Sequence, residues 1–297
     1  MERLLTTSGL HPALIFGQLR GEVIDYVISS YELDMRLVRM WYFRPGIQIH
    51  CGRAYNYIPS DMGSIIHEHP QMRNGGKYHS KFILITTGEM LRLIIMTTNI
   101  TKMVQNVEND YYIADIPKSE SVNRTWNTDL LNRYFSLVGV ILKVDITQYA
   151  WQGIHGQLMC SLPMFITHSE CWRQIQPMRE TEGVATVKAS TGVLSYDIRP
   201  VFGIQRCRFQ YSKKNQNLGI IDKIDSGYYE IEELKDAMTY HQKLYIIYYT
   251  APVYEKWYII TSANLTKSAW SNINYEMGVA WNCTSRPQSN KELFKRI

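Results

Sequence analysis

The chain has 297 residues, of which 45% are hydrophobic and 20% charged, and its formal net charge is +5. This composition excludes a disordered chain, and the length allows one large domain or two domains of about 150 residues. The mild positive charge favours a polyanionic partner such as nucleic acid, but it fits a basic globular protein without that role equally well.

The cysteines and the N-terminus indicate the cellular compartment. The five cysteines are odd in number and lack CxxC spacing, so we expect reduced thiols rather than a disulfide framework or a zinc ribbon. MERLLTTSGLHPALIF has no basic leader before a long apolar run, and no window approaches 18 uninterrupted apolar residues. We therefore expect a soluble intracellular protein that is not secreted and has no membrane partner.

In chain order, the first predicted elements precede a buried hairpin. GEVIDYVISSY (21–31) has a helical pattern, and MRLVRMWYF (35–43) is a plausible strand before the turn at RPGI. Residues 46–78 should form short strands and polar loops. KFILITT and LRLIIMT (81–97) then predict a buried hairpin or two neighbouring strands.

The second half of the chain repeats this out-and-back form. KLYIIYY (243–249) and WYIIT (257–261) are again apolar runs, joined by a longer loop. The predicted helices are TDLLNRYFSLVGVILKV (128–144), YEIEELKDAMTY (229–240) and LTKSAW (265–270).

These elements predict an α/β fold of two similar halves, each a mixed β-sheet flanked by helices. The halves would be residues 1–150 and 151–297, related by a pseudo-twofold with the active site at their interface. The boundary is inferred from the repeat, because no low-complexity linker interrupts the chain.

The repeat itself carries the chemistry. Each copy is His-x-Lys, an apolar strand, a polar turn, a second apolar strand and then Asn. Two positions apart on a strand, the His and Lys side chains point to the same face, and the Asn returns near that strand end. The two sets are His79, Lys81 and Asn99 in the first half, and His241, Lys243 and Asn264 in the second.

Such a pair of sets suits phosphoryl chemistry. Lys supplies charge and donors, Asn supplies neutral donors, and His can attack or exchange a proton near pH 7. Two sets facing each other would place one His on each side of phosphorus for an in-line displacement. The two Lys would replace the charge compensation of a divalent metal, so we expect no metal and no other cofactor.

The duplicated pattern resembles the phospholipase D superfamily, whose phospholipases and nucleases carry HxKxxxxD in each half. At the two Asp positions this chain has Thr86 and Tyr248. The missing aspartates, with TTN, TSANLTKSAW and NYEMGVAW, resemble the tyrosyl-DNA phosphodiesterase branch. The resemblance covers roughly 75–115 and 238–282, and the chain looks like a short, minimal catalytic core.

The resemblance implies distinct roles for the two histidines. His79 would be the nucleophile, and His241 the general acid that protonates the leaving tyrosyl oxygen and then the base that activates water. Glu276 would orient His241, and Asp110 falls where the family commonly places a carboxamide partner of the first His. The groups that would hold the phosphate oxygens are Lys81, Lys243, Asn99, Asn264 and Thr266.

The function implied by the resemblance is DNA repair. The substrate would be DNA, expected to be single-stranded, with a 3′-phosphotyrosyl or other blocked 3′ end, such as that left by a stalled topoisomerase I. Exonuclease-like removal of the adduct would leave a 3′-phosphate and a freed peptide. We expect a monomer in the nucleus, with the cytoplasm as the alternative. The rival functions are a broader superfamily nuclease or phosphodiesterase, a catalytically inactive nucleic-acid-binding relative and a structural dimerisation module.

Other side chains are weaker candidates with plain structural alternatives. His67, Glu68 and His69 could be metal ligands, although adjacent loop residues are more often solvated. The basic segment 206–214 fits a single-strand groove or equally a solvated edge strand. Tyr31 lies near a substrate-contacting family position and fits a core aromatic equally well. Thr191 and Ser226 are further candidates, because they resemble substrate-contacting hydroxyl residues of the family.

Overall fold

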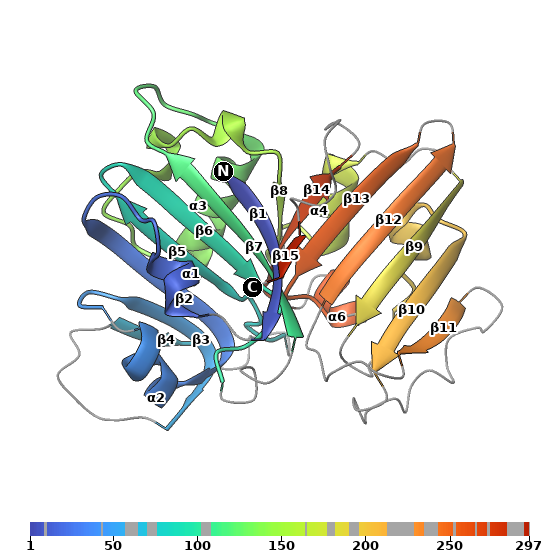
Figure 1. Ribbon diagram of the computed structural model, residues 1–297, viewed down its shortest axis with the longest axis horizontal. Helices are drawn as coiled ribbons and strands as arrows, with labels where there is room; N and C mark the ends of the chain where they lie inside the picture. Colours follow the sequence, from blue (N-terminus) through green and yellow to red (C-terminus); the bar gives the residue numbers. More distant parts are fainter. Residues whose placement is uncertain are drawn as a thin grey trace.

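The chain is described here by a computed structural model. It describes residues 1–8, 11–42, 44–56, 65–69, 76–101, 108–163, 165–176, 182–189, 196–212, 229–234, 243–251, 254–264, 266–271, 274–283 and 294–296. Within these ranges the chain forms two mixed β-sheets (Figure 1).

The first sheet is built almost entirely from the N-terminal part of the chain. Its strand order is β15-β1-β7-β6-β5-β2-β3-β4, with parallel pairs at both edges and antiparallel pairs between them. The bounds are β1 (Glu2–Ser8), β2 (Val23–Asp34), β3 (Gln48–Tyr55), β4 (Ile65–Glu68), β5 (Phe82–Thr87), β6 (Met90–Met96), β7 (Glu108–Pro117) and β15 (Phe294–Arg296).

The second sheet has the order β11-β10-β9-β12-β13-β14-β8. Strands β9, β10 and β11 are parallel to one another, and the remaining pairs are antiparallel. The bounds are β8 (Gln157–Ser161), β9 (Glu182–Ala189), β10 (Arg206–Ser212), β11 (Tyr229–Leu234), β12 (Lys243–Ala251), β13 (Glu255–Thr261) and β14 (Glu276–Asn282).

The described helices are mostly short. They are α1 (Pro12–Phe16), α2 (Met35–Leu37), the π-helical η1 (Val38–Tyr42), α3 (Trp126–Val138), the 3-10 turns η3 (Ile146–Gln148) and η4 (Trp151–Gly153), α4 (His168–Ile175), α5 (Arg199–Phe202) and α6 (Lys267–Trp270). None of the helices in the described ranges is long and apolar enough to cross a membrane.

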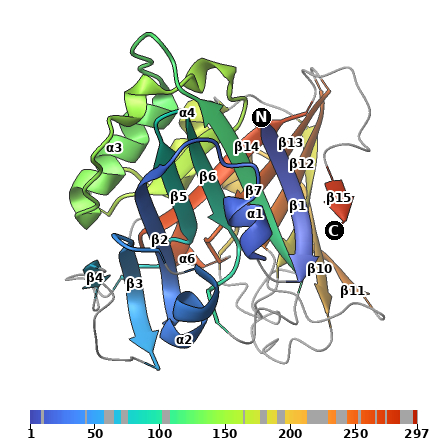
Figure 2. The ribbon, with the colours of Figure 1, turned by 60° about the vertical axis from the view of Figure 1, so that its left-hand side comes forward.

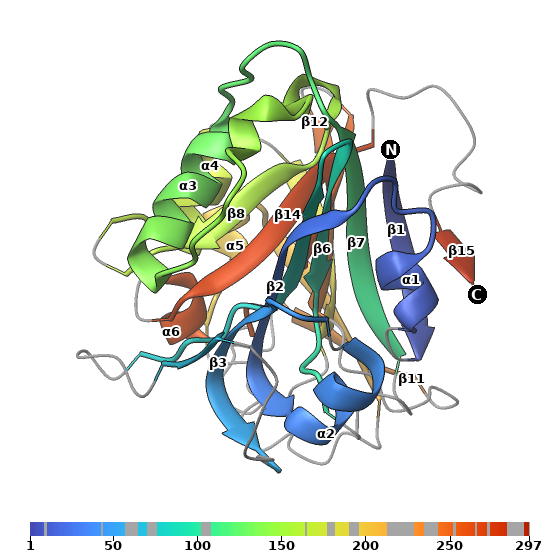
Figure 3. The same ribbon diagram turned by 90° about the vertical axis from the view of Figure 1, so that its left-hand side faces the viewer.

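Helices cover both faces of the first sheet. Figure 3 shows α1 and α2 on one side and α3 on the other. On the α1 side, the Phe16 ring meets Tyr26 edge-on at 5.5 Å. On the α3 side, the Phe82 ring of β5 packs against Tyr134 and Phe135 at 5.9 and 6.0 Å. The continuous apolar runs are therefore explained by burial of both sheet faces.

The two sheets share one hydrophobic core. Figure 2 shows strands of the second sheet passing behind β6 and β7 of the first. At this junction the Tyr112 and Trp281 rings meet edge-on at 5.9 Å. The far face of the second sheet packs on its helices, where Trp172 of α4 meets Trp257 at 5.3 Å. The predicted architecture of two mixed sheets with helices is confirmed, while the pseudo-twofold and the boundary near residue 150 stay predictions.

The hairpin predictions are confirmed in both sheets. β5 pairs antiparallel with β6, and β12 with β13. The helix predicted at 128–144 forms as α3 but ends earlier, at Gly139, whose φ of +79° closes the last turn. Residues beyond it leave the helix. The helix predicted around LTKSAW forms as α6.

Three element predictions were wrong. The segment 21–31 is not helical but forms β2, buried through its middle between β5 and β3, so its apolar spacing reflects two covered faces. The segment 35–43, predicted as a strand, is helical in its described part as α2 and η1. The segment 229–240 was predicted as a helix, but its described part, residues 229–234, forms β11, where Tyr, Glu and Ile alternate as on a strand. Residues 235–240 lie outside the described ranges.

Candidate active site

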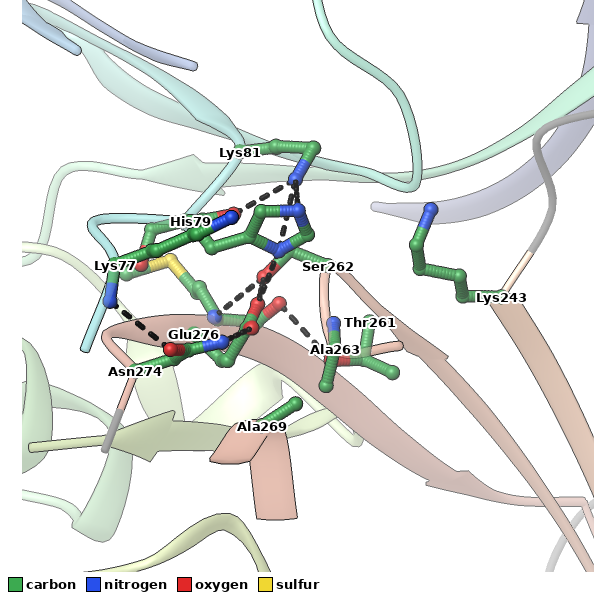
Figure 4. Close-up of polar contacts among 12 residues, drawn as sticks. Lys77, His79, Lys81, Lys243, Thr261, Ser262, Ala263, Ala269, Asn274 and Glu276 are labelled. Atoms are coloured by element: carbon green, nitrogen blue, oxygen red, sulfur yellow. Dashed lines mark hydrogen bonds and ion pairs between the residues drawn. The ribbon is translucent and has the colours of Figure 1, made fainter. Parts of the chain in front are cut away.

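Two segments from different sheets run side by side at the site. Tyr78 and Tyr275 form a parallel β-bridge. The His79 N–H donates to the Tyr275 carbonyl at 2.9 Å, and the Tyr275 N–H donates to the Lys77 carbonyl at 3.0 Å. One segment leads into β5 and the other into β14. The bridge therefore places His79 beside Glu276, the first residue of β14 (Figure 4).

The His79 imidazole is oriented by the Glu276 carboxylate. The His79 Nδ1 lies 2.9 Å from the Glu276 Oε2. Because an ionised carboxylate can only accept, Nδ1 must carry the proton. At neutral pH the lone pair is then on Nε2, the nitrogen of a histidine nucleophile.

Glu276 itself is fully buried and held by two further donors. The Ser262 Oγ donates to its Oε2 at 2.6 Å, and the Asn274 Nδ2 donates to its Oε1 at 3.2 Å. Burial alone would raise the pKa of Glu276, but His79, Lys81 and the Ser262 hydroxyl outweigh burial and lower that pKa to about 2. The carboxylate is therefore ionised throughout the physiological pH range.

The surroundings keep His79 neutral. Burial lowers its pKa to about 4, opposed by Glu276 and reinforced by the charges of Lys81 and Lys243. Protonation would place another cation beside two buried lysines. A neutral ring with its proton on Nδ1 is the form that a nucleophile requires.

Two buried lysines, Lys81 and Lys243, act on the imidazole. The Lys81 Nζ donates to the His79 carbonyl at 2.8 Å and lies 3.1 Å from the His79 Nε2. Burial lowers the pKa of Lys81 to about 7, against the opposing effect of Glu276 and Glu32. The Lys243 Nζ donates to the Thr97 carbonyl at 2.9 Å, and burial followed by repulsion from Lys81 lowers its pKa well below the usual value. An anion bound between these lysines would favour their charged forms.

Sulfate binding should weaken as pH rises above about 7 and should take up protons at pH 8. The Lys81 ammonium loses its proton near pH 7 in the free protein, and a bound dianion raises the pKa of both lysines, so protons are drawn in. Calorimetry in buffers of different ionisation enthalpy measures this uptake. Lys81→Met should reduce it. Sulfate binding at pH 8 without proton uptake would contradict the lowered lysine pKa values.

The prediction for the partner of Glu276 was wrong. Glu276 was expected to orient the second histidine, but its Oε2 contacts His79 of the other half. His241 lies outside the described residues. The resemblance was taken to imply the second histidine, whereas the observed pairing crosses between the sheets.

A repeated hydrogen-bond pattern locates the counterpart of Glu276. In the second sheet, the Ser262 N–H donates to the Met277 carbonyl at 2.9 Å, and the Met277 N–H donates to the Ser262 Oγ at 3.0 Å. In the first sheet, the Thr97 N–H donates to the Asp110 carbonyl at 3.2 Å, and the Asp110 N–H donates to the Thr97 Oγ1 at 3.1 Å. Asp110 is therefore the counterpart of Met277.

It follows that Asn109, one residue earlier, is the counterpart of Glu276. Asn109 is fully buried and is a carboxamide, the residue type that the family resemblance implies at this position. The sequence left open whether Asp110 supports the first His or is a loop carboxylate; the His79 Nδ1 contacts Glu276 instead, and Asp110 is buried in β7. Counting residues from Asn99 led to Asp110, one position after Asn109. The carboxamide of Asn109 was the sequence signal that could have identified it.

The remaining predicted phosphate ligands lie at the ends of the two hairpins. Asn99 follows β6, and its buried Oδ1 has no hydrogen-bond partner among the described residues. Asn264 lies between β13 and α6 and is half-buried. Thr266 is the N-cap of α6, where its Oγ1 accepts from the Ala269 N–H at 3.3 Å. Their contacts with phosphate oxygens stay predictions.

Thr86, at one of the superfamily's Asp positions, has a structural role. Its Oγ1 donates to the buried Asp25 Oδ2 at 2.8 Å and accepts from the Asp25 N–H at 3.1 Å. The same carboxylate accepts from the Lys143 and Val144 N–H groups at 2.9 and 3.2 Å. Thr86 thus helps to fasten the connection after α3 onto the first sheet.

Restoring the superfamily aspartate by Thr86→Asp should destabilise the protein by about 3 kcal/mol, because two carboxylates would meet in a buried site and one would have to be protonated. Thr86→Ser keeps the hydroxyl and should cost about 1 kcal/mol or less. Denaturant unfolding at pH 7 measures both. Equal stability of the two variants would show that Asp25 tolerates a second carboxylate.

The weaker candidates have mixed outcomes. His67 and His69 are half-buried, and their rings stack on His50 of β3 at centroid distances of 4.7 and 5.4 Å, while Glu68 is exposed. No group of three or more His, Cys, Asp or Glu in the described part of the chain is arranged to hold a metal ion. The Tyr31 ring lies 5.1 Å from the His79 ring, so it borders the site.

The basic segment is only partly described. Arg206 and Arg208 are exposed on β10, which lies between β9 and β11, so the edge-strand interpretation was wrong. Its lysines, with Thr191 and Ser226, lie outside the described residues.

Comparisons with known proteins agree with this site. The family model described as Tyrosyl-DNA phosphodiesterase matches residues 199–292, the range that contains Lys243, Asn264 and Glu276. No curated protein sequence matches the chain.

Several solved structures share the fold. A yeast tyrosyl-DNA phosphodiesterase with a histidine-to-asparagine substitution has a TM-score of 0.77 at 12% identity, covering 100% of this chain and 96% of that chain. The yeast enzyme without a stated substitution has a TM-score of 0.72 at 12% identity, covering 95% and 90%. Polyphosphate kinase from Porphyromonas gingivalis has a TM-score of 0.51 at 11% identity, covering 97% and 48%.

The predicted resemblance is thereby confirmed. At these identities the solved structures establish the fold along the whole chain, and the family match covers part of its C-terminal half. Together they support a phosphodiesterase hydrolase.

Proposed function

We propose that this chain, of the tyrosyl-DNA phosphodiesterase type, hydrolyses the bond between a 3′-phosphate of DNA and a tyrosine. The observation that carries the proposal is the His79–Glu276 pair, joined across the two sheets at 2.9 Å, with the buried Lys81 and Lys243 acting on the imidazole. A neutral imidazole with its lone pair on Nε2, beside two buried lysines that a bound phosphate would keep charged, suits attack on a phosphodiester.

In the first step, the His79 Nε2 donates its lone pair to phosphorus. The bond between phosphorus and the tyrosyl oxygen breaks, and its electron pair leaves with that oxygen, which takes a proton from His241. The phosphorylated imidazole keeps its Nδ1 proton, and the ionised Glu276 stabilises the positive charge that the ring acquires. The product is a covalent phosphohistidine and a free tyrosyl peptide.

In the second step, His241 takes a proton from water, and the water oxygen attacks phosphorus. The bond between phosphorus and Nε2 breaks, which returns the electron pair to His79 and leaves a 3′-phosphate end. Lys81 and Lys243 carry the charge compensation for the nonbridging oxygens, with Asn99 and Asn264 as further donors. The reaction needs no metal in this proposal.

The test uses a single strand that ends in a 3′-phosphotyrosine and the same strand without the adduct, both in EDTA. We expect tyrosine release only from the first. Loss of turnover in EDTA would overturn the metal-independent mechanism, and equal cutting of the plain strand would favour the broader nuclease alternative.

The biological substrate proposed is the topoisomerase I peptide on single-stranded DNA, handled by a monomer in the nucleus or, alternatively, the cytoplasm. Light scattering tests the oligomeric state, and cell fractionation tests the location. If a double-stranded substrate were turned over faster than a single strand, the proposed preference for single-stranded DNA would be contradicted.

A further inference from the structure

Asn274 connects the two segments that form the site (Figure 4). Its Oδ1 accepts from the Lys77 N–H at 3.0 Å, and its Nδ2 donates to the Glu276 Oε1 at 3.2 Å. The residue is only 9% exposed. One amide thus contacts the segment that carries His79 and also the carboxylate that orients His79.

The position of Asn274 extends the backbone bridge between the sheets. Tyr275 already exchanges backbone hydrogen bonds with Lys77 and His79. The side-chain Oδ1 of Asn274 adds one more hydrogen bond to this ladder, because it accepts from the Lys77 N–H. The Nδ2 of the same side chain donates to Glu276. The register of the bridge is therefore coupled to the orientation of the Glu276 carboxylate.

We propose that Asn274 is a positioning residue for the nucleophile, acting through Glu276. Its effect on catalysis rests on the proposed function; its effect on His79 does not. Ser262 and His79 both bind Oε2 of Glu276, so these two contacts leave the carboxylate free to rotate about that oxygen. The Asn274 donor on Oε1 fixes the second oxygen and thus the plane of the group.

The charged groups near Asn274, Glu276 and His79 determine how a substitution of Asn274 can change the pKa of His79. The titratable groups that act on His79 within the described residues are Glu276, Lys81 and Lys243. Glu276 also influences His168 and Tyr245 on neighbouring elements. Asn274 contributes a neutral donor, so replacing it by an acid adds a charge without adding bulk.

The test compares Asn274→Ala and Asn274→Asp with matched changes at Asn127. Asn127 is also a buried bridge, whose Oδ1 accepts from the Leu158 N–H at 2.8 Å and whose Nδ2 donates to the Gly156 carbonyl at 2.9 Å. Its described contacts are backbone groups away from the site. Both asparagines therefore have the same structural task, and only Asn274 touches Glu276.

Asn274→Ala should lower kcat roughly tenfold with little change in KM, as found for residues that orient a functional group through another. Asn274→Asp places an anionic oxygen against Glu276, so the pKa of His79 should rise. Its activity should then fall more at pH 5.5 than at pH 7.5. Asn127→Ala and Asn127→Asp should lower the melting temperature and leave the pH profile unchanged.

Imidazole NMR of His79 provides a readout that does not depend on turnover. A changed Nδ1 proton resonance in both Asn274 variants and a raised pKa of His79 in Asn274→Asp, with neither change in the Asn127 variants, would support the proposal. Equal melting losses at both asparagines, with the His79 resonance and pH profile unchanged, would overturn it. If the wild-type chain releases no tyrosine, the proposed function fails, and the NMR titration still decides the role of Asn274.

Discussion

His79→Gln should lower kcat/KM on a 3′-phosphotyrosyl strand by roughly ten-thousand-fold or more, the scale of loss when a covalent nucleophile is removed. The glutamine amide can still donate toward Glu276, so the fold should persist, but it cannot form the phosphohistidine. Initial rates of tyrosine release measure the effect. His241→Ala should behave differently, because the first step can proceed slowly while hydrolysis lacks its base, and a covalent DNA adduct should accumulate on His79.

The control for the loss of an imidazole is His168→Gln. His168 is buried, with hydroxyls of Ser161 and Thr261 at 3.3 and 2.9 Å from its ring nitrogens, and burial lowers its pKa to about 4. This variant should lose stability and retain most activity. Mass spectrometry locates the adduct in His241→Ala. An adduct on the second half of the chain would reverse the assigned roles, and a fully active His79→Gln would remove the mechanism.

Arg92→Ala should reduce the free energy of unfolding by about 3 kcal/mol, because it removes a fully buried guanidinium and leaves the Ile15 and Gly17 carbonyls without this donor, while Asp115 keeps its ion pair with Arg3. Arg92 is fully buried in β6, and its guanidinium forms two hydrogen bonds with the Asp115 carboxylate of β7. It also donates to the Ile15 and Gly17 carbonyls at 2.9 and 2.6 Å, which fastens α1 over the sheet. Thermal and denaturant unfolding measure the loss.

The matched control is Arg199→Ala at an exposed pair. The Arg199 Nη2 lies 2.7 Å from the Asp197 Oδ2, but the Asp197 side chain is 42% exposed. Such pairs contribute about 1 kcal/mol or less, because water and salt screen them. Equal losses in Arg92→Ala and Arg199→Ala would show that burial of the Arg92 pair does not determine its contribution.

The sequence alone determined the features that depend on local composition. The two Ile-rich hairpins were predictable, because a continuous apolar run is typical of a strand with both faces covered. The proximity of His79 and Lys81 was also predictable from their two-residue spacing, and the Lys81 Nζ lies 3.1 Å from the His79 Nε2. The second pair stays a prediction, because His241 lies outside the described residues. The absence of acids at Thr86 and Tyr248, together with TTN, TSANLTKSAW and NYEMGVAW, indicated the resemblance to the tyrosyl-DNA phosphodiesterase branch.

The tertiary structure decided everything that depends on how the two sheets meet. β2 was predicted as a helix, because buried strands and buried helices have similar apolar patterns and differ only in their neighbours. The partner of Glu276 was predicted within its own half, yet the bridge between Tyr78 and Tyr275 brings His79 to it from the other sheet. Asn274 gave no sequence signal at all, because its role is to join these two segments.

Hydrogen bonds between residues far apart in the chain leave no periodic trace in the sequence. Local spacing therefore determined which residue types the site contains, and strand register determined which of them meet. Asn109 illustrates the difference: one position of register separates it from Asp110, and only the repeated contact with Thr97 showed which residue corresponds to Glu276. Successive side chains of a strand point to opposite faces of the sheet, so a register error of one position assigns a different side chain to the site.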